Sequence, residues 1–262
     1  MTYCVAISTQ DGLVFCSDTR TSAGSDMLYS HSKMHRFHPD PGRMFVILSS
    51  GNLATTQAII NRIESDMENP ELVNLRNCPK ILDAAQYVSG IIREEQTKAQ
   101  TSTAQSSVDT SVSLIFGGQI QGGEPAIYMM YTAGNFISNS DETPFLQIGE
   151  TKYGKPILDR ILSKQTSLED AARCAIVSMD STIRSNATVG APIEVLVYEK
   201  DTFESNHYIN MNEDDEYLRQ VKQAWNEAIQ AAFVGLPKFD WEKRSNSNLQ
   251  VVNEDFQNQT SS

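Results

Sequence analysis

Thr2 is the first residue whose type and position could support catalysis. If Met1 is removed, as commonly happens when the next residue is small, Thr2 carries both a hydroxyl group and a free α-amino group. Such an amine has a pKa of about 7.7–8.0, so part of it can accept the hydroxyl proton near neutral pH. Nucleophile and base then belong to one residue. Because a preceding residue would turn the amine into an amide, we expect no leader ahead of Thr2.

Asp18, Lys33 and Gly51 follow Thr2 in the N-terminal part of the chain. Each also has an ordinary structural explanation. Asp18 could form a surface ion pair with Arg20, worth about 0–1 kcal/mol. Lys33 could be solvated, and Gly51 could simply mark the entry to a helix. The occurrence of all three in this order after Thr2 favours a functional role for the set.

Strand-like runs must position these residues. Apolar, β-favouring segments bounded by turn signals predict strands at Thr2–Thr9, Leu13–Ser17, Arg43–Gly51, Ser111–Gln119, Ala126–Thr132 and Pro192–Lys200, with shorter candidates at Phe145–Glu150 and His207–Asn212. Turn residues at Gln10–Gly12 and at Gly122 and Gly123 predict two hairpins. Thr21–Ser30, rich in Gly, Ser and Thr, is expected to be a loop.

Helical spacing of apolar residues predicts five helices, over Asn52–Met67, Cys78–Gln100, Lys155–Leu162, Ser167–Asn186 and Glu216–Gly235. Asn52 and Ser167 are suited to cap two of them. Pro79 fits a first helical turn. Gly235 and Pro237 are expected to end the last helix.

The order of these elements predicts the fold. Strands occur in hairpins rather than in strict strand–helix–strand alternation, and pairs of helices separate them. This pattern predicts an α/β (α+β) fold with two antiparallel sheets and helices packed outside, a four-layer αββα sandwich. We expect one domain over residues 1–240 and a polar, flexible C-terminal tail over residues 241–262.

Bulk composition excludes several classes of function. The formal net charge is −12 and the pI about 4.8, so nucleic acid and anionic membranes offer no electrostatic attraction. The chain has neither an apolar run long enough to span a bilayer nor the pattern of a signal peptide, and we expect a cytoplasmic protein. The cysteines lack paired or metal-like spacing, and we expect small buried thiols at Cys4, Cys16, Cys78 and Cys174.

Longer motifs resemble the proteasome β-type subunits, which are N-terminal nucleophile hydrolases. They are DGLVFCSDTRTSAG, SKMHRF and SSGNLATTQAI. Two later stretches are more similar to the bacterial ancestral β-subunit group, Anbu, than to the classical proteasome. They are IGETKYGKPILDR and RSNATVGAPIEVLVYE. The resemblance covers about residues 2–235. It implies an N-terminal nucleophile hydrolase fold, a peptide or protein substrate, and self-association into a closed ring or an open helical stack.

The resemblance also implies roles. Thr2 matches the nucleophile and its base, and Lys33 matches a buried ammonium that favours the reactive form of the hydroxyl. Asp18 matches the carboxylate that keeps Lys33 charged, because an unpaired buried charge is costly. The Gly51 amide matches an oxyanion donor, typically worth about 10²–10³ in turnover. Relative to the family, one residue is missing between Asp18 and Lys33, so the match for the substrate pocket is looser. The residues that match the lining of the primary specificity pocket are Thr21, His31, His35, Ser49 and Leu53.

The second half of the chain departs from the family pattern. Glu150 occupies the serine position of a Gly-Ser-Gly turn. In the other supporting region, an Asp, a Ser and two Gly are replaced in order by Ser185, Thr188, Val189 and Gly190. We expect the Thr188 hydroxyl to bond the Thr2 amine, whereas Ser185 cannot supply the missing negative charge.

Metal and phosphate chemistry are poorly supported. His31, His35 and His38 are close in sequence, but their segment is expected to be loop and strand and lacks an HExxH motif. The glycines of GGQIQGG join two strands and open no helix, which argues against a phosphate loop. We expect no cofactor and no metal.

Two classes of function remain open. The first is a threonine-type hydrolase of peptide amides, with an acyl-transfer or amide-forming enzyme as a variant that uses the same nucleophile. The second is a catalytically weak or inactive self-assembling subunit, which the altered supporting residues and the apolar helix faces at Leu53–Met67 and Val221–Phe233 permit. Retention of Met1 in the mature protein would leave only the second.

Overall fold

The computed structural model describes residues 1–22, 28–103, 108–205 and 207–242. The chain divides into two compact units, Met1–Val221 and Lys222–Ser262. Every strand described below belongs to the first unit. The boundary expected after residue 240 remains a prediction, and most of the expected tail, residues 243–262, lies outside the described residues.

The first sheet contains the strand that starts directly after Thr2. Its order is β10-β1-β2-β11-β12 and all its pairings are antiparallel. The strands are β1 (Tyr3–Ser8), β2 (Gly12–Asp18), β10 (Phe145–Gly149), β11 (Ile193–Glu199) and β12 (His207–Met211). Strands β1 and β2 are buried throughout, which is why their sequences are nearly continuous apolar runs. The predicted β1–β2 hairpin is confirmed.

The second sheet is also antiparallel and has the order β5-β6-β7-β8-β9. Its strands are β5 (Met34–Phe37), β6 (Arg43–Gly51), β7 (Val112–Ile120), β8 (Ala126–Met130) and β9 (Phe136–Ser138). The predicted β7–β8 hairpin is confirmed. A separate two-stranded sheet pairs β3 (Arg20–Ser22) with β4 (Leu28–Ser30).

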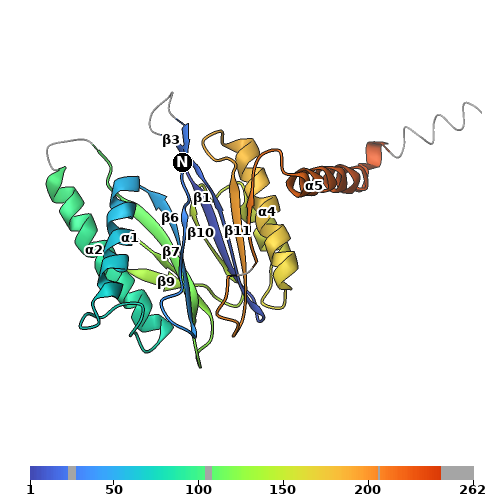
Figure 1. The fold of residues 1–262 in the computed structure, drawn as a ribbon. Helices are drawn as coiled ribbons and strands as arrows, with labels where there is room; N and C mark the ends of the chain where they lie inside the picture. Colours follow the sequence, from blue (N-terminus) through green and yellow to red (C-terminus); the bar gives the residue numbers. More distant parts are fainter. Residues whose placement is uncertain (23–27, 104–107, 206, 243–262) are drawn as a thin grey trace, which may run out of the picture. The chain divides into compact units, whose positions relative to one another are not determined.

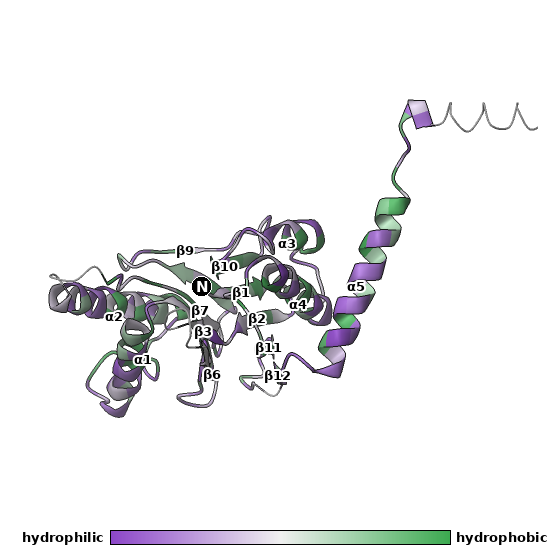
Figure 2. Ribbon diagram, turned by 90° about the horizontal axis from the view of Figure 1, so that it is seen from above, coloured by the Kyte–Doolittle hydropathy of each residue, from purple (hydrophilic) through white to green (hydrophobic). Residues whose placement is uncertain are grey.

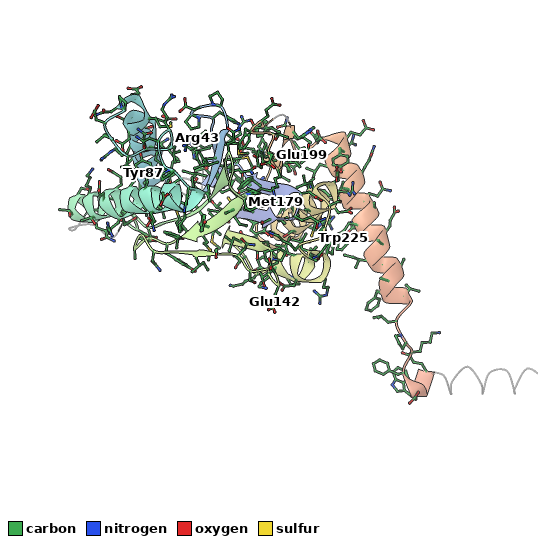
Figure 3. The ribbon with its side chains drawn as sticks, turned by 90° about the horizontal axis from the view of Figure 1, so that it is seen from below. Arg43, Tyr87, Glu142, Met179, Glu199 and Trp225 are labelled. Carbon is green, nitrogen blue, oxygen red and sulfur yellow. The ribbon has the colours of Figure 1, made fainter. Side chains whose placement is uncertain are left out.

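Three hydrophobic clusters hold the layers of the first unit together. One lies between the two sheets and includes Phe15 and Leu48. A second joins the first sheet to α3 (Lys155–Ile161) and α4 (Leu168–Ser185), and includes Met179, labelled in Figure 3. The third joins the second sheet to α1 (Leu53–Glu68) and α2 (Ile81–Ser102). Figure 1 shows α1 and α2 on one side of the sheets and α4 on the other, so the predicted four-layer sandwich is confirmed.

Local side-chain caps explain where two helices begin. The Asn52 side chain accepts a hydrogen bond from the Thr55 N–H at 3.0 Å, and the Ser167 hydroxyl accepts one from the Asp170 N–H at 3.2 Å. Both satisfy backbone donors that have no partner within the helix. The expectation for Pro79 is wrong, because α2 starts after Lys80 and the proline therefore precedes the helix.

Several short strands escape the sequence pattern. β5 and β9 are edge strands of four and three residues, too short to display a hydrophobic period. Within Thr21–Ser30, expected to be a loop, parts belong to β3 and β4. Each is defined by pairing with a neighbouring strand, which a local pattern does not report.

The predicted last helix is confirmed as α5 (Glu216–Val234). It begins in the first unit and ends in the second, and Leu218 is its buried residue. Figure 2 shows hydrophobic and hydrophilic residues interspersed along it. Among the described residues, no helix combines the length and the apolar character needed to cross a membrane.

Candidate active site

Thr2 opens onto a cavity of about 350 Å³ beside the start of β1 and the ends of β6 and β10. Figure 2 shows the N-terminus over the two sheets, between α1 and α4. The lining brings together the end of β6, the start of α1, and the segments that flank β1 and β5. Its residues are Met1, Thr2, Arg20, Thr21, His31, Ser32, Lys33, Ser49, Ser50, Gly51, Leu53, Thr56 and Gly149.

Two hydrogen bonds fix the backbone at Thr2 and Tyr3. The Glu150 N–H donates to the Thr2 carbonyl oxygen at 2.7 Å. The next residue, Tyr3, donates its N–H to Asp18 Oδ1 at 3.1 Å. Gly149 has φ +83°, and a Cβ atom there would overlap the Thr2 carbonyl. Glycine at position 149 therefore allows β10 to approach the N-terminus this closely.

The Tyr3 side chain also holds the start of β1, through contacts in the interior of the first unit. It is fully buried, and its hydroxyl lies 2.6 Å from Ser178 Oγ of α4. Gln147 Nε2 also donates to that hydroxyl at 2.6 Å. Because its phenol is bonded to both α4 and β10, Tyr3 holds the start of β1 in a defined place.

Asp18 and Lys33 form a buried ion pair beside Thr2. Lys33 Nζ donates to Asp18 Oδ1 at 2.6 Å and to the Arg20 carbonyl oxygen at 2.7 Å. Asp18 is fully buried and Lys33 is 7% exposed. The alternatives of a solvated Lys33 and of an Asp18–Arg20 surface pair are therefore wrong.

The charge of Asp18 depends on its surroundings. Burial raises the pKa of this carboxyl, and the Lys33 ammonium and the N–H groups of Tyr3 and Gly190 lower it by less, so its pKa lies above the ordinary aspartate value. Desolvation disfavours the ionised form, whereas a cation and donated hydrogen bonds favour it. Lys33 is thus the main group that keeps Asp18 ionised.

Gly51 lies at the end of β6, where the chain enters α1. It lines the cavity and has φ +109°, and a Cβ atom there would collide with the backbone carbonyl of Ser111. Glycine is required by this close approach to the neighbouring strand as well as by the conformation. The structure thus brings Thr2, Lys33 and Gly51 to one cavity, with Asp18 directly behind Lys33.

Four of the five side chains predicted to bind substrate line the cavity, namely Thr21, His31, Ser49 and Leu53. His35 does not. It pairs with Ile47 in the β5–β6 register and so lies on the face of the second sheet that packs against α1 and α2. Its Nε2 is buried and has no hydrogen-bond partner among the described residues. Burial, and to a smaller extent His31, lower the pKa of His35 to about 4.

Thr188 also lies outside the cavity lining. Its hydroxyl donates to Asn186 Oδ1 at 2.6 Å, and its N–H bonds the same oxygen. Asn186 in turn donates through Nδ2 to Glu150 Oε2 at 3.2 Å. The Glu150 side chain is buried. Glu150 therefore brings a carboxylate next to the backbone segment that holds Thr2, while the bond from Thr188 to the Thr2 amine stays a prediction.

Arg20, Ser32 and Thr56 line the cavity, although the sequence had not predicted a site role for them. Glu194, also not predicted, lies behind the cavity and contacts Ser32. Glu194 is buried and accepts a hydrogen bond from Ser32 Oγ at 2.8 Å. The only local signal for Glu194 is an acidic residue within the apolar strand PIEVLVYEK. Of the residues that the structure describes, no three His, Cys, Asp or Glu side chains are grouped so that they could hold a metal ion.

The two antiparallel sheets between helical layers form a sandwich of the N-terminal nucleophile type. Residues 2–198 match the proteasome subunit family, and the chain belongs to that family. No curated protein matches it.

Solved structures narrow the assignment to the Anbu group. Anbu (ancestral beta-subunit) from Yersinia bercovieri is 40% identical over 91% of this chain and 100% of that one, with a TM-score of 0.86. An Anbu (Gly-1) mutant from Hyphomicrobium sp. strain MC1 is 41% identical over 92% and 100%, with a TM-score of 0.85. The helical assembly of the Anbu complex from Pseudomonas aeruginosa is 43% identical over 91% and 98%, with a TM-score of 0.85.

Proposed function

We propose that this protein is a threonine-type N-terminal nucleophile hydrolase that cleaves peptide amides after loss of Met1. One observation carries the proposal: a buried Lys33–Asp18 ion pair lies beside the cavity that Thr2 and Gly51 line. A buried charge pair at the wall of a cavity is a recognised feature of catalytic sites.

In the proposed reaction the Thr2 amine accepts the hydroxyl proton, and the hydroxyl oxygen attacks the substrate carbonyl. The tetrahedral oxyanion is stabilised by the Gly51 N–H. The C–N bond then breaks, the leaving amine takes the proton, and an ester to Thr2 remains. A water molecule, deprotonated by the α-amine of Thr2, then hydrolyses this ester and restores the enzyme.

Lys33 and Asp18 act electrostatically in this scheme. The Lys33 ammonium favours the alkoxide character that the Thr2 hydroxyl acquires as it attacks. Asp18 keeps Lys33 oriented, and because both charges are buried, each prevents the other from being left uncompensated. Thr188 remains a proposed partner of the amine. Glu150, whose N–H binds the Thr2 carbonyl, is a second candidate to supply negative charge near it.

The test combines intact mass with a threonine-directed electrophile. Protein purified from its native host should have lost Met1, and a peptide epoxyketone or β-lactone should form a stoichiometric adduct on Thr2. Thr2→Ala should lose the adduct and all turnover while keeping its circular dichroism spectrum and melting temperature. Retention of Met1, or unchanged hydrolysis by Thr2→Ala at a purity that excludes contaminants, would contradict the proposal.

A second candidate is a self-assembling subunit, and one observation favours it: a similar structure is described as the helical assembly of the Anbu complex. We propose that this chain also forms a homo-oligomer, as a ring or an open helical stack, in the cytoplasm. Light scattering that finds only a 29.1 kDa species would exclude both arrangements. Assembly together with an unreactive Thr2 would favour this candidate over the hydrolase.

A further inference from the structure

The cavity at Thr2 has a charge bias opposite to that of the whole chain. Its lining contains the basic residues Arg20, His31 and Lys33, several hydroxyl groups, and no Asp or Glu among the residues that the structure describes. The chain as a whole has 33 acidic residues against 21 Lys and Arg. A basic wall in an acidic protein favours a ligand of negative charge.

Lys33 is not the source of this selectivity. Its ammonium is already paired with Asp18 at 2.6 Å, so the two charges largely cancel for a ligand in the cavity. Within the described residues, Arg20 forms no ion pair with a carboxylate. The hydrogen bonds recorded for its side chain run from Nη1 to two backbone carbonyls, Ala187 at 2.8 Å and Val189 at 3.5 Å.

The position of the Arg20 guanidinium is fixed before any ligand binds. Besides these two hydrogen bonds, it lies directly against Gly190, where a Cβ atom would collide with it. Its Nε and Nη2 donors have no acceptor within the described part of the chain. A guanidinium held in this way binds a carboxylate through two parallel hydrogen bonds, and little side-chain entropy is lost.

Two acidic residues lie near the cavity but do not line it, and their negative charges disfavour an anionic ligand. Glu194 accepts the Ser32 hydroxyl from behind the wall, and Glu150 follows Gly149 and accepts from Asn186. Neither side chain lines the cavity. Because their charges lower the positive potential, a preference for an anion has to come from hydrogen bonds donated by Arg20 rather than from the potential as a whole.

We propose that the cavity selects the carboxylate side chain of glutamate or aspartate, at the residue whose carbonyl group Thr2 attacks, with Arg20 as the specificity-determining residue. The choice of that substrate residue rests on the proposed hydrolase function. The charge preference itself rests on the lining of the cavity.

Binding can be measured without turnover. The probes are two fluorescent tetrapeptides that end in glutamic acid α-amide or in glutamine α-amide, and the protein is the Thr2→Ala variant with Met1 removal verified by mass. We expect the glutamate peptide to bind about five- to tenfold more tightly at low salt, because hydrogen bonds to a charged group are stronger than neutral ones. The ratio should shrink in 0.5 M salt.

Variants in the same background test Arg20 itself. Arg20→Gln should bind the two peptides equally, and Arg20→Lys should restore part of the preference. The matched control is Arg36→Gln, which removes the same charge from an exposed side chain that lies over the Tyr208 ring, 3.9 Å from its centroid, outside the cavity. It should keep the preference. If Arg20→Gln does not fold, the peptide ratio and its salt dependence still decide the question.

Failures of the two proposals are distinguishable. Equal binding of the two peptides, no binding of either at millimolar concentration, or an unchanged preference in Arg20→Gln overturns the charge preference. Absence of electrophile labelling in the wild-type protein overturns the hydrolase function. A glutamate preference without labelling would leave a binding site for acidic peptides in a subunit that does not hydrolyse them.

Discussion

Asp18 and Glu194 are buried carboxylates on neighbouring strands of one sheet, and they are stabilised in different ways, one by a cation and the other by hydroxyl groups. Asp18, on β2, contacts the Lys33 ammonium at 2.6 Å. Glu194, on β11, accepts hydrogen bonds from hydroxyl groups: Ser17 at 3.3 Å, Ser32 at 2.8 Å and Tyr208 at 2.7 Å. Both residues are at most 3% exposed.

The difference indicates that the two carboxylates have different roles. Asp18 holds a cation at the cavity, whereas Glu194 links secondary-structure elements to one another. Lys33 lines the cavity together with Thr2, and Asp18 lies behind Lys33. The Glu194 network joins β2, the segment before β5, and β12. Tyr208 reflects this environment, because burial and its hydrogen bond to Glu194 raise the pKa of its hydroxyl to about 12.

The largest effect should come from breaking the ion pair. Lys33→Met leaves the Asp18 carboxylate buried without a cation, and we expect the free energy of unfolding to fall by about 3–5 kcal/mol. Urea denaturation measures this loss. In the double variant Asp18→Asn and Lys33→Met, most of the stability should return, but Thr2 should not be labelled by the electrophile, because the Lys33 ammonium is missing. A double variant as unstable as Lys33→Met alone would contradict this account of the pair.

His35 extends the comparison to a half-buried base, whose Nε2 is buried without a hydrogen-bond partner in the described part of the chain. Its folded-state pKa of about 4 lies below the ordinary value of 6.5, so the stability it contributes is present above pH 6.5 and is lost as the pH falls toward 4. We expect wild type to lose about 2 kcal/mol more than His35→Leu between pH 7 and pH 4.5. Parallel losses measured by urea denaturation at the two pH values would refute this.

Glu194→Gln should have a smaller effect than Lys33→Met. Glutamine keeps the shape and some hydrogen bonds but loses the charge that strengthens them, and we expect a loss of about 2 kcal/mol on unfolding. Electrophile labelling of Thr2 should persist, because Glu194 does not line the cavity. Loss of labelling in a variant whose melting curve stays cooperative would show that Glu194 belongs with Asp18 instead.

Tyr208→Phe should have the smallest effect. It removes one donor to Glu194, while Ser17 and Ser32 still donate, so the carboxylate remains solvated by protein hydroxyls. We expect a loss of about 1 kcal/mol in urea denaturation. A loss as large as that of Lys33→Met would mean that the hydroxyl network is as indispensable to its carboxylate as the lysine is to Asp18.

Long periodic segments could be predicted because they depend on nearby residues. The α1 and α4 caps at Asn52 and Ser167, the β1–β2 hairpin and the apolar β6 strand are all confirmed. The short edge strand β9 was missed, and β5 was expected only as an undelimited part of a loop-and-strand segment, because pairing with β8 and β6 is what defines these strands. Thr2, Lys33 and Gly51, which the family motifs singled out, line one cavity, and their catalytic roles remain predictions.

The sequence alone determined the long helices and strands, because these follow from local spacing. It also determined, through the resemblance of its motifs to a family, which residues are candidates for threonine chemistry. Tertiary structure decided that Asp18 pairs with Lys33 rather than Arg20, that His35 faces a helical layer instead of the cavity, and that Thr188 donates its hydroxyl to Asn186. Such partners are set by strand order and by the close approach of backbones far apart in the chain, as where Gly149 meets Thr2.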